Sequence, residues 1–391
     1  MKCSMGNDMC QIKFYLTISV ILVLLSLFGF SWGRSLFHLC GFTLQTDVVG
    51  QFGDFVGGVV GTIVSVVLLY FTFKTQHTDV ENKNKMYKEE SVNKLFFHML
   101  DLYNDTLNRY VVNDGETLNL KGKEALHYQY EQLYEDFQVD DNADINVIRK
   151  KAKATFQVFY ANTQDISPIF FRTVYSLLKI LDIDDQDTER ERIRLMKILR
   201  AQLSNTELIM LRYNAMTRMG KKSYELINKF NIMKHLFPMD LLEYKPWSKK
   251  MTLEERTFTN QLLMIVKQNI KKVLRENSNI ESYSNNIMCY NTHVSINAAK
   301  TELKVCLFIK NGIIPNSHSL VKGIQELSSN ERMSLLHQFI VDFFISRIQK
   351  ADEYRNIKIE DVNEANSGKW TVKVSTKNGK PFDHDSSRDF L

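Results

Sequence analysis

The 391-residue chain lacks an excess of charge of either sign, because 50 lysine and arginine residues are nearly balanced by 45 aspartate and glutamate residues. A net charge of +5 over this length does not indicate a nucleic-acid-binding protein. Cysteine is also scarce, and the five cysteines form no Cys-x-x-Cys pair and no spacing typical of metal ligands. The composition therefore argues against a disulfide framework and predicts no metal site.

Signature motifs of several enzyme classes are missing as well. The chain contains no GxxxxGK[ST] phosphate loop, no GxSxG elbow and no HExxH zinc motif. The acidic run DIDDQDTE at residues 182–189 resembles a calcium loop, but its sixth position is not glycine and its twelfth is Ile193. We interpret this run as a solvated loop between helices, and we expect no cofactor.

Long apolar runs are present near the N-terminus. Residues 14–32, FYLTISVILVLLSLFGFSW, carry no charge, and as a helix they cover about 28 Å, close to the hydrocarbon thickness of a bilayer. A second run covers about residues 52–73 and contains one ionisable residue, Asp54. The first run is longer than the core of a signal peptide and no A-x-A site follows it. Residues 1–75 are therefore predicted to form a two-span hairpin in contact with membrane lipids.

The distribution of lysine and arginine predicts the orientation of this hairpin. Lysines precede the first run and follow the second, whereas the loop between the runs carries a single arginine, Arg34. Segments rich in lysine and arginine that flank membrane spans usually remain on the cytoplasmic side of the membrane. We therefore expect a multi-pass protein whose N- and C-termini are both cytoplasmic.

Small residues recur every four positions in GQFGDFVGGVVGTIVS, residues 50–65. In lipid, such a stripe lets two helices approach closely. The stripe either packs against the first span of its own hairpin or joins copies of the second span in a homo-oligomer. Asp54 borders it, either as a cap of the helix N-terminus or as a gating group in an assembled oligomer. The candidate residues for transmembrane packing or gating are Gly53, Asp54, Gly57, Gly58, Gly61 and Ser65.

The remainder of the chain has mostly helical periodicity, which predicts a mainly α fold. Residues 76–95 are expected to form a helical stem, and residues 96–275 a helical cytosolic domain. The face of the first helix in that domain is predicted to comprise Leu95, Phe96, Met99, Leu102, Tyr103 and Leu107.

Two local signals stand out within the helical domain. Ser204 and Glu207 have the spacing of a capping box. Gly220 follows the same apolar pattern at the place of a C-terminal glycine cap. We therefore expect a helix that begins after Ser204 and ends at Gly220, while residues 253–275 give another long helical pattern.

The C-terminal region, residues 276–391, is expected to contain a helix at 319–350 and a small β-hairpin at 357–376. The segment TELKVCLFIK within it fits either a strand or a buried helix.

Arg332 and His337, in NERMSLLHQF, have the Arg-x4-His spacing of helical HEPN-type ribonucleases. In such enzymes the two side chains would polarise an RNA hydroxyl and stabilise the phosphorane charge. A five-residue separation does not place both side chains on one helical face. We therefore interpret them as a surface arginine and an amphipathic-helix histidine, and the pair remains the alternative catalytic site.

Several segments resemble, in order, motifs of the phage abortive infection protein family (AbiC-like). They are GQFGDFVGGVVGTIVSVVLLYFTFKTQ, NKLFFHMLDLYND, FFRTVYSLLKILD and LRAQLSNTELIMLRYNAM. The resemblance covers about residues 45–235 and is most specific around LRAQLSNTELIML. Related proteins tend to show Gly-Arg-x-Ala-Phe where this chain has GKEAL at residues 122–126. The C-terminal third lies outside the resemblance.

The resemblance implies a protein of the bacterial inner (cytoplasmic) membrane that acts in antiviral defence and has a helical cytosolic domain. Together with the residue patterns it predicts an effector that perturbs the membrane as an oligomer, without covalent chemistry. Its partners would be further copies of the chain and either a phage-derived protein trigger or a co-encoded defence protein. The alternatives are a membrane-tethered RNase using Arg332 and His337, and a non-enzymatic membrane scaffold for partner defence proteins.

Overall fold

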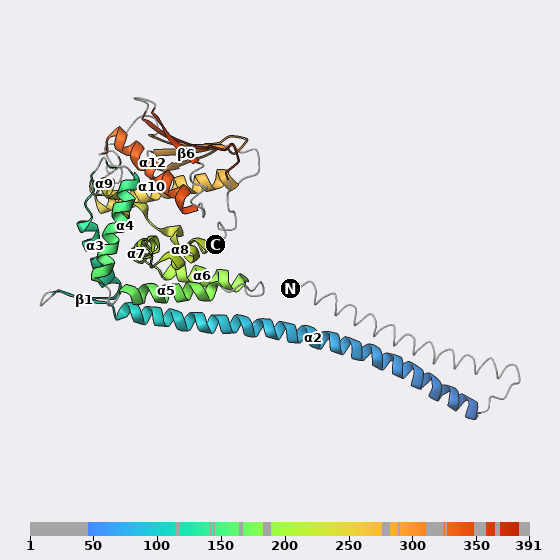
Figure 1. Ribbon diagram of the computed structural model, residues 1–391. Helices are drawn as coiled ribbons and strands as arrows, with labels where there is room; N and C mark the ends of the chain where they lie inside the picture. The colour runs from blue at the N-terminus through green and yellow to red at the C-terminus, as the bar shows by residue number, and fades with distance from the viewer. Residues whose placement is uncertain are drawn as a thin grey trace. The chain divides into compact units, whose positions relative to one another are not determined.

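The computed structural model describes most of the chain from residue 46 onward (Figure 1). The described residues are 46–114, 118–140, 143, 145–163, 167–182, 189–275, 282–287, 290–309, 324, 327–347, 357–363 and 368–382. The chain divides into two compact units, Met1–Lys88 and Glu89–Leu391. The first predicted membrane span, at 14–32, lies outside the described residues.

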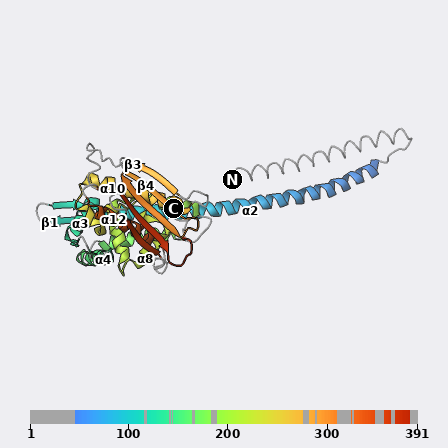
Figure 2. The same cartoon turned by 90° about the horizontal axis from the view of Figure 1, so that it is seen from above.

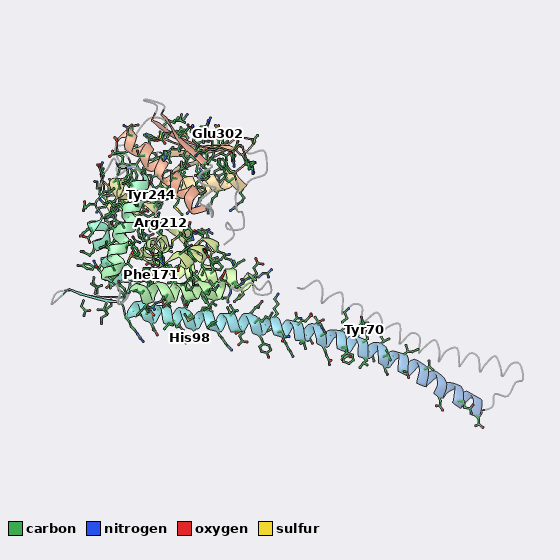
Figure 3. The ribbon with its side chains drawn as sticks, viewed as in Figure 1. Tyr70, His98, Phe171, Arg212, Tyr244 and Glu302 are labelled. Carbon is green, nitrogen blue, oxygen red and sulfur yellow. The ribbon has the colours of Figure 1, made fainter. Side chains whose placement is uncertain are left out.

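Helix α2 (Thr46–Asn108) contains the second apolar run and the predicted stem. Hydroxyl groups along the run donate to carbonyls one turn earlier, as Thr62 does to Gly58 O (2.6 Å) and Ser65 to Gly61 O (2.7 Å). These bonds hide the polar side-chain atoms of the run against the backbone. Ile63 and Tyr70 nevertheless leave 59% and 62% of their surface exposed (Figure 3).

Within the described residues, α2 is the one helix long and apolar enough to cross a membrane. Length and composition are weak evidence by themselves, because core helices and signal sequences can share them. The core-helix alternative does not fit α2, since none of its most apolar window is buried.

The last turns of α2 belong to the second unit and bury a face that the sequence predicted in part, since Phe96, Tyr103 and Leu107 are buried as expected. Phe96, Leu100, Tyr103 and Leu107 are buried, with the three- and four-residue spacing of one helical face. Leu95 and Leu102, which the prediction placed on that face, are 48% and 47% exposed. The prediction was wrong at these two residues because it extended the apolar face too far to one side of the buried stripe.

The body of the second unit is helical, with a short antiparallel hairpin before its first complete helix. Strands β1 (Val111–Asp114) and β2 (Leu118–Lys121) form this hairpin. The helices that follow are α3 (Gly122–Asp136), α4 (Ile145–Asn162), α5 (Ser167–Leu181), α6 (Glu189–Gln202), α7 (Asn205–Met216), α8 (Lys221–Lys229), the short η2 (Ile232–His235), η3 (Pro238–Asp240), η4 (Leu242–Tyr244) and α9 (Lys245–Ser248), and α10 (Leu253–Arg275).

The predicted capping box is present at the start of α7. Glu207 N donates to Ser204 Oγ (3.3 Å), and Ser204 N donates to the Glu207 carboxylate (2.6 Å). The helix then ends at Met216, earlier than expected. Gly220 is therefore not its C-terminal cap but the N-cap of α8, with an ordinary φ of −88°. Glycine is needed there for space, since a Cβ would lie 2.0 Å from Asn214 O.

The C-terminal region forms a five-stranded antiparallel sheet in the order β3-β4-β5-β7-β6. Its strands are β3 (Ser282–Ile287), β4 (Tyr290–Ile296), β5 (Glu302–Ile309), β6 (Ile357–Asn363) and β7 (Lys369–Thr376). The predicted hairpin is confirmed as β6–β7, and TELKVCLFIK contains strand β5. The fold is thus mostly helical with a small sheet near the C-terminus, which is larger than the single hairpin expected from the sequence.

Two helices cover one face of this sheet (Figures 1 and 2). Helix α10, confirmed at its predicted bounds, packs on β3 and β4, and α12 (Ser329–Arg347) packs on β6 and β7. Alternate residues of β4 are buried, as expected for a strand with one covered face. The sheet therefore holds α10 and α12 side by side below it.

We expect Gly220→Ala to lower the free energy of unfolding by about 1–3 kcal/mol, because the added methyl group must displace the backbone at Asn214. Thermal and chemical unfolding of the full chain in detergent would measure the loss. Lys221→Ala, one residue later on an exposed site, is the matched control. Equal stability of the two variants would show that the close approach of Gly220 to Asn214 does not constrain the fold.

Candidate functional site

The second unit contains a cavity of about 340 Å³ that is lined by parts of five α-helices and the segments between them. Helices α4, α7, α8, α10 and α12 and the short η2–η4 segments all contribute residues. Its apolar wall consists of Ala215, Met216, Ile227, Met233, Leu236, Pro238, Leu241, Phe339 and Phe343. Its polar residues are Arg149, Arg212, Tyr224, Asn228, Asn231, Tyr244, Lys267 and Asp342. Figure 3 places Arg212 and Tyr244 within this body.

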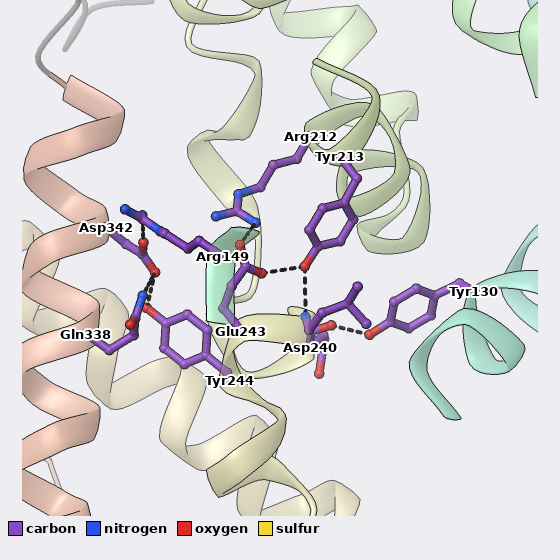
Figure 4. A network of polar contacts seen from close by, with 10 residues as sticks. Tyr130, Arg149, Arg212, Tyr213, Asp240, Glu243, Tyr244, Gln338 and Asp342 are labelled. Atoms are coloured by element: carbon purple, nitrogen blue, oxygen red, sulfur yellow. Dashed lines mark hydrogen bonds and ion pairs between the residues drawn. The ribbon is translucent and has the colours of Figure 1, made fainter. Parts of the chain in front are cut away.

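A buried ion pair lies at one side of the cavity (Figure 4). The Glu243 side chain, on η4, is completely buried and accepts from Arg212 Nη1 at 2.9 Å. Its second oxygen accepts from the Tyr213 hydroxyl at 2.5 Å, and that hydroxyl in turn accepts from Leu242 N at 2.8 Å. Each oxygen of the carboxylate thus accepts a hydrogen bond from a side chain of α7, which offsets the cost of burying the charge.

The electrostatics of this pair favour the charged forms of both partners. Burial alone would raise the pKa of Glu243, but the positive charge of Arg212 and the Tyr213 hydrogen bond outweigh it, so the pKa lies below its ordinary 4.5. Burial likewise opposes the charge of Arg212, and the attraction of Glu243 still raises the pKa of that guanidinium. Burial is also the main cause of the raised pKa of Tyr213, which therefore remains a donor.

A second acidic side chain, near the first ion pair, joins three elements (Figure 4). Asp342, on α12, forms an ion pair with Arg149 of α4. Its other oxygen accepts from the Tyr244 hydroxyl at 2.7 Å and from Gln338 Nε2 at 3.0 Å. Glu243 and Tyr244 are adjacent in sequence, so η4 connects the two ion pairs directly.

A third acid, Glu207, is completely buried and joins α7 to the end of α2 and to α3. Besides its capping bond, it accepts a hydrogen bond from the Tyr103 hydroxyl and lies 3.3 Å from Lys123 Nζ. The lysine also donates to Gln202 O at 2.9 Å, so it links α3 to the end of α6 as well as to α7.

The residues predicted from the sequence lie elsewhere. The small-residue stripe from Gly53 to Ser65, with Asp54, is exposed on α2. No described atom lies within 4 Å of a Cβ built at Gly53, Gly57, Gly58 or Gly61, apart from the helix's own neighbouring backbone. The surface of the stripe is therefore unoccupied by the described part of the chain.

Arg332 and His337 both lie on α12 but contact different partners. Arg332 Nε donates to Ile324 O at 2.6 Å, and its guanidinium lies 5.0 Å from the centre of the Trp370 ring. His337 Nδ1 lies 2.6 Å from a carboxylate oxygen of Asp361, on β6. Each side chain is thus directed at its own part of the sheet. His235, the last residue of η2, is exposed.

Sequence reasoning missed the residues around the cavity because their partners are far apart in the chain. Arg149 and Asp342 are separated by 193 positions, and Arg212 and Glu243 by 31. A signal was nevertheless present. Asp342 in FIVDFF is a single acid in apolar surroundings, and an acid removed from water requires a cation or several donors beside it.

We expect Glu243→Gln to lower the free energy of unfolding by about 3–5 kcal/mol at pH 7, because it leaves the Arg212 charge buried without its counter-ion. The folded-state pKa of Glu243 is depressed, so the pair contributes its full stability above the unfolded-state pKa near 4.5. That contribution is lost as the pH falls through the lower folded-state pKa. The stability difference between the parent and Glu243→Gln should therefore shrink on acidification below about pH 4.5.

Chemical unfolding of both proteins over this pH range would measure the effect. Glu191→Gln is the matched control, because it breaks an ion pair with the half-exposed Arg194 and should change stability little. A stability difference that persists unchanged at low pH would contradict the assignment of the charge to Glu243.

One segment of this chain matches a family model in the comparison with known proteins. Residues 164–241 match a family model described as "Putative phage abortive infection protein". No curated protein and no solved structure matches the chain. The matched segment runs from the start of α5 to η3 and includes Glu207, Arg212 and much of the cavity wall. Over residues 164–241 the chain is thus a match to the phage abortive infection proteins.

Proposed function

We propose that this protein is a membrane-anchored effector of antiviral abortive infection in bacteria, with both termini in the cytoplasm. The cytosolic body responds to a phage-derived protein or to a co-encoded defence protein. The membrane helices then assemble with those of other copies and perturb the inner membrane. In this proposal no covalent chemistry is required of the chain.

The observation that carries the proposal is the exposed apolar half of α2 in a chain that matches the abortive infection family. Side chains such as Val66 and Tyr70 are exposed over a length sufficient to cross the hydrocarbon of a bilayer. Contiguous apolar surface of this kind indicates a membrane or protein partner. The hydrocarbon of a bilayer would cover this apolar surface, and no partner protein is needed to bury it.

The small-residue stripe supports assembly through α2. Gly57 and Gly61 are one helical turn apart and have open space in front of them. Helices in lipid gain from close backbone contact at such positions, since the surrounding lipid removes the hydrophobic driving force. The proposed oligomer uses this stripe as the contact between copies.

Helix α2 also supports communication with the family-matched segment. Tyr103, near its C-terminal end, donates to the buried Glu207 of α7. A ligand or partner that displaced α7 would change this contact, and a conformational change can be driven only by such a difference in contacts. The Tyr103–Glu207 contact is therefore the proposed route from the body into α2.

We expect the double variant Gly57→Leu/Gly61→Leu to insert normally, because leucine favours insertion, and to assemble poorly. Each close helix–helix contact that is lost in lipid costs about 1–2 kcal/mol of association free energy, and the loss repeats in every subunit. Native mass measurement in detergent should give a smaller species, and phage challenge should show lost protection at normal protein levels.

Val59→Leu/Ile63→Leu is the matched control, because it places the same two leucines away from the stripe. It should assemble and protect like the parent. If the glycine variant also did so, the stripe would not be the contact between copies and the proposed mechanism would fail.

A further inference from the structure

The cavity in the second unit has the size and lining of a small-molecule site. Its volume of about 340 Å³ falls in the range of pockets that hold organic ligands. Most of its wall is apolar, with Met216 and Ile227 from the family-matched segment and Phe339 and Phe343 from α12. Such a wall suits the apolar body of a ligand and gives it little polar anchorage.

Positive charge predominates among the polar residues of the wall. Arg149, Arg212 and Lys267 line the cavity, whereas Asp342 is the single carboxylate among its lining residues. Glu243 lies behind Arg212 and is completely buried. The cationic side chains of the lining outnumber its carboxylates. The cavity therefore attracts an anionic ligand and repels a cationic one.

Arg212 has hydrogen-bonding capacity that its ion pair does not use. A guanidinium carries five N–H donors in a planar fork. Within the described residues, Arg212 makes one hydrogen bond, from Nη1 to Glu243, while its charged group also lies 5.4 Å from the centre of the Tyr213 ring. Because Arg212 lines the cavity, its remaining donors can be satisfied there by the oxygens of a ligand.

We propose that this cavity binds a small amphipathic anion, with an apolar body against the aromatic and aliphatic wall and one carboxylate or phosphate group on Arg212 and Lys267. Lys267 supplies a point charge from α10, and Arg212 supplies planar donors that match either anion. Binding would connect α7 and α8 to α10 and α12. The inference does not depend on the proposed membrane activity, because binding is measured directly.

The test uses the full chain in nanodiscs of phosphatidylethanolamine and phosphatidylglycerol, with empty nanodiscs subtracted. The probes share one apolar body: 2-naphthoate, 2-naphthyl phosphate and the uncharged 2-naphthamide. Calorimetric titration should give saturable binding of one anion per chain, with 2-naphthamide at least about tenfold weaker. The relative affinities of the two anions distinguish a carboxylate from a phosphate ligand.

Variants of the lining residues distinguish the effect of their charge on binding from the effect of the space in the cavity. Lys267→Gln should weaken anion binding about tenfold and leave the amide unchanged. Lys271→Gln, one turn further along α10 and outside the lining, is the matched control. Ala215→Leu should block all three probes by filling the cavity. In Arg212→Gln/Glu243→Gln, the buried pair is replaced by two amides that can still hydrogen-bond, and this variant should also lose the preference for anions.

The thermal unfolding temperature of each variant shows whether it is folded before binding is compared. If Ala215→Leu does not fold, Lys267→Gln and its control decide the question. Absence of saturable binding by either anion would overturn the proposal. So would equal affinity for 2-naphthamide, or binding to Lys267→Gln with the strength of the parent.

Discussion

The apolar surface along the first half of α2 is the constraint on which the account of this protein depends. Large side chains such as Ile63 and Tyr70 remain exposed on a helix that continues to Asn108. Nearer its C-terminal end, the same helix buries Phe96 and Tyr103 in a packed protein core. One helix thus combines a surface suited to lipid with a surface suited to a protein interior. Between them, the hydroxyl groups of Thr72, Thr75 and Thr78 donate to backbone carbonyls one turn earlier.

The helical body is organised around two buried acids and one partly buried acid, each held by partners from other elements. Glu207 connects α7 to α2 and α3, Glu243 connects η4 to α7, and Asp342 connects α12 to α4 and η4. Buried pairs of this kind contribute little net stability compared with apolar packing, but removing one partner is costly. They therefore fix which elements meet, and they place the charged groups of the cavity beside its apolar wall.

Local signals in the sequence predicted much of the fold. The Ser204–Glu207 capping box, helix α10 and the β6–β7 hairpin depend on neighbouring residues and were predicted correctly. Strands β3 and β4 were missed, because their Asn- and Ser-rich sequence acquires its alternating burial only against α10. Gly220 was misassigned because its role depends on the backbone of Asn214, which the glycine approaches only in the folded chain. The cavity could not be predicted, because the residues that form it are far apart in the sequence. Arg149 and Asp342, for example, are 193 positions apart.

The membrane potential of phage-infected cells, recorded together with the integrity of their RNA, tests the central claim most directly. Cells carrying the parent protein should depolarise after infection while their RNA remains intact, whereas cells without the protein should keep their potential over the same interval. Degradation of RNA in cells whose membrane potential is maintained would contradict the account, and would direct attention to Arg332 and His337.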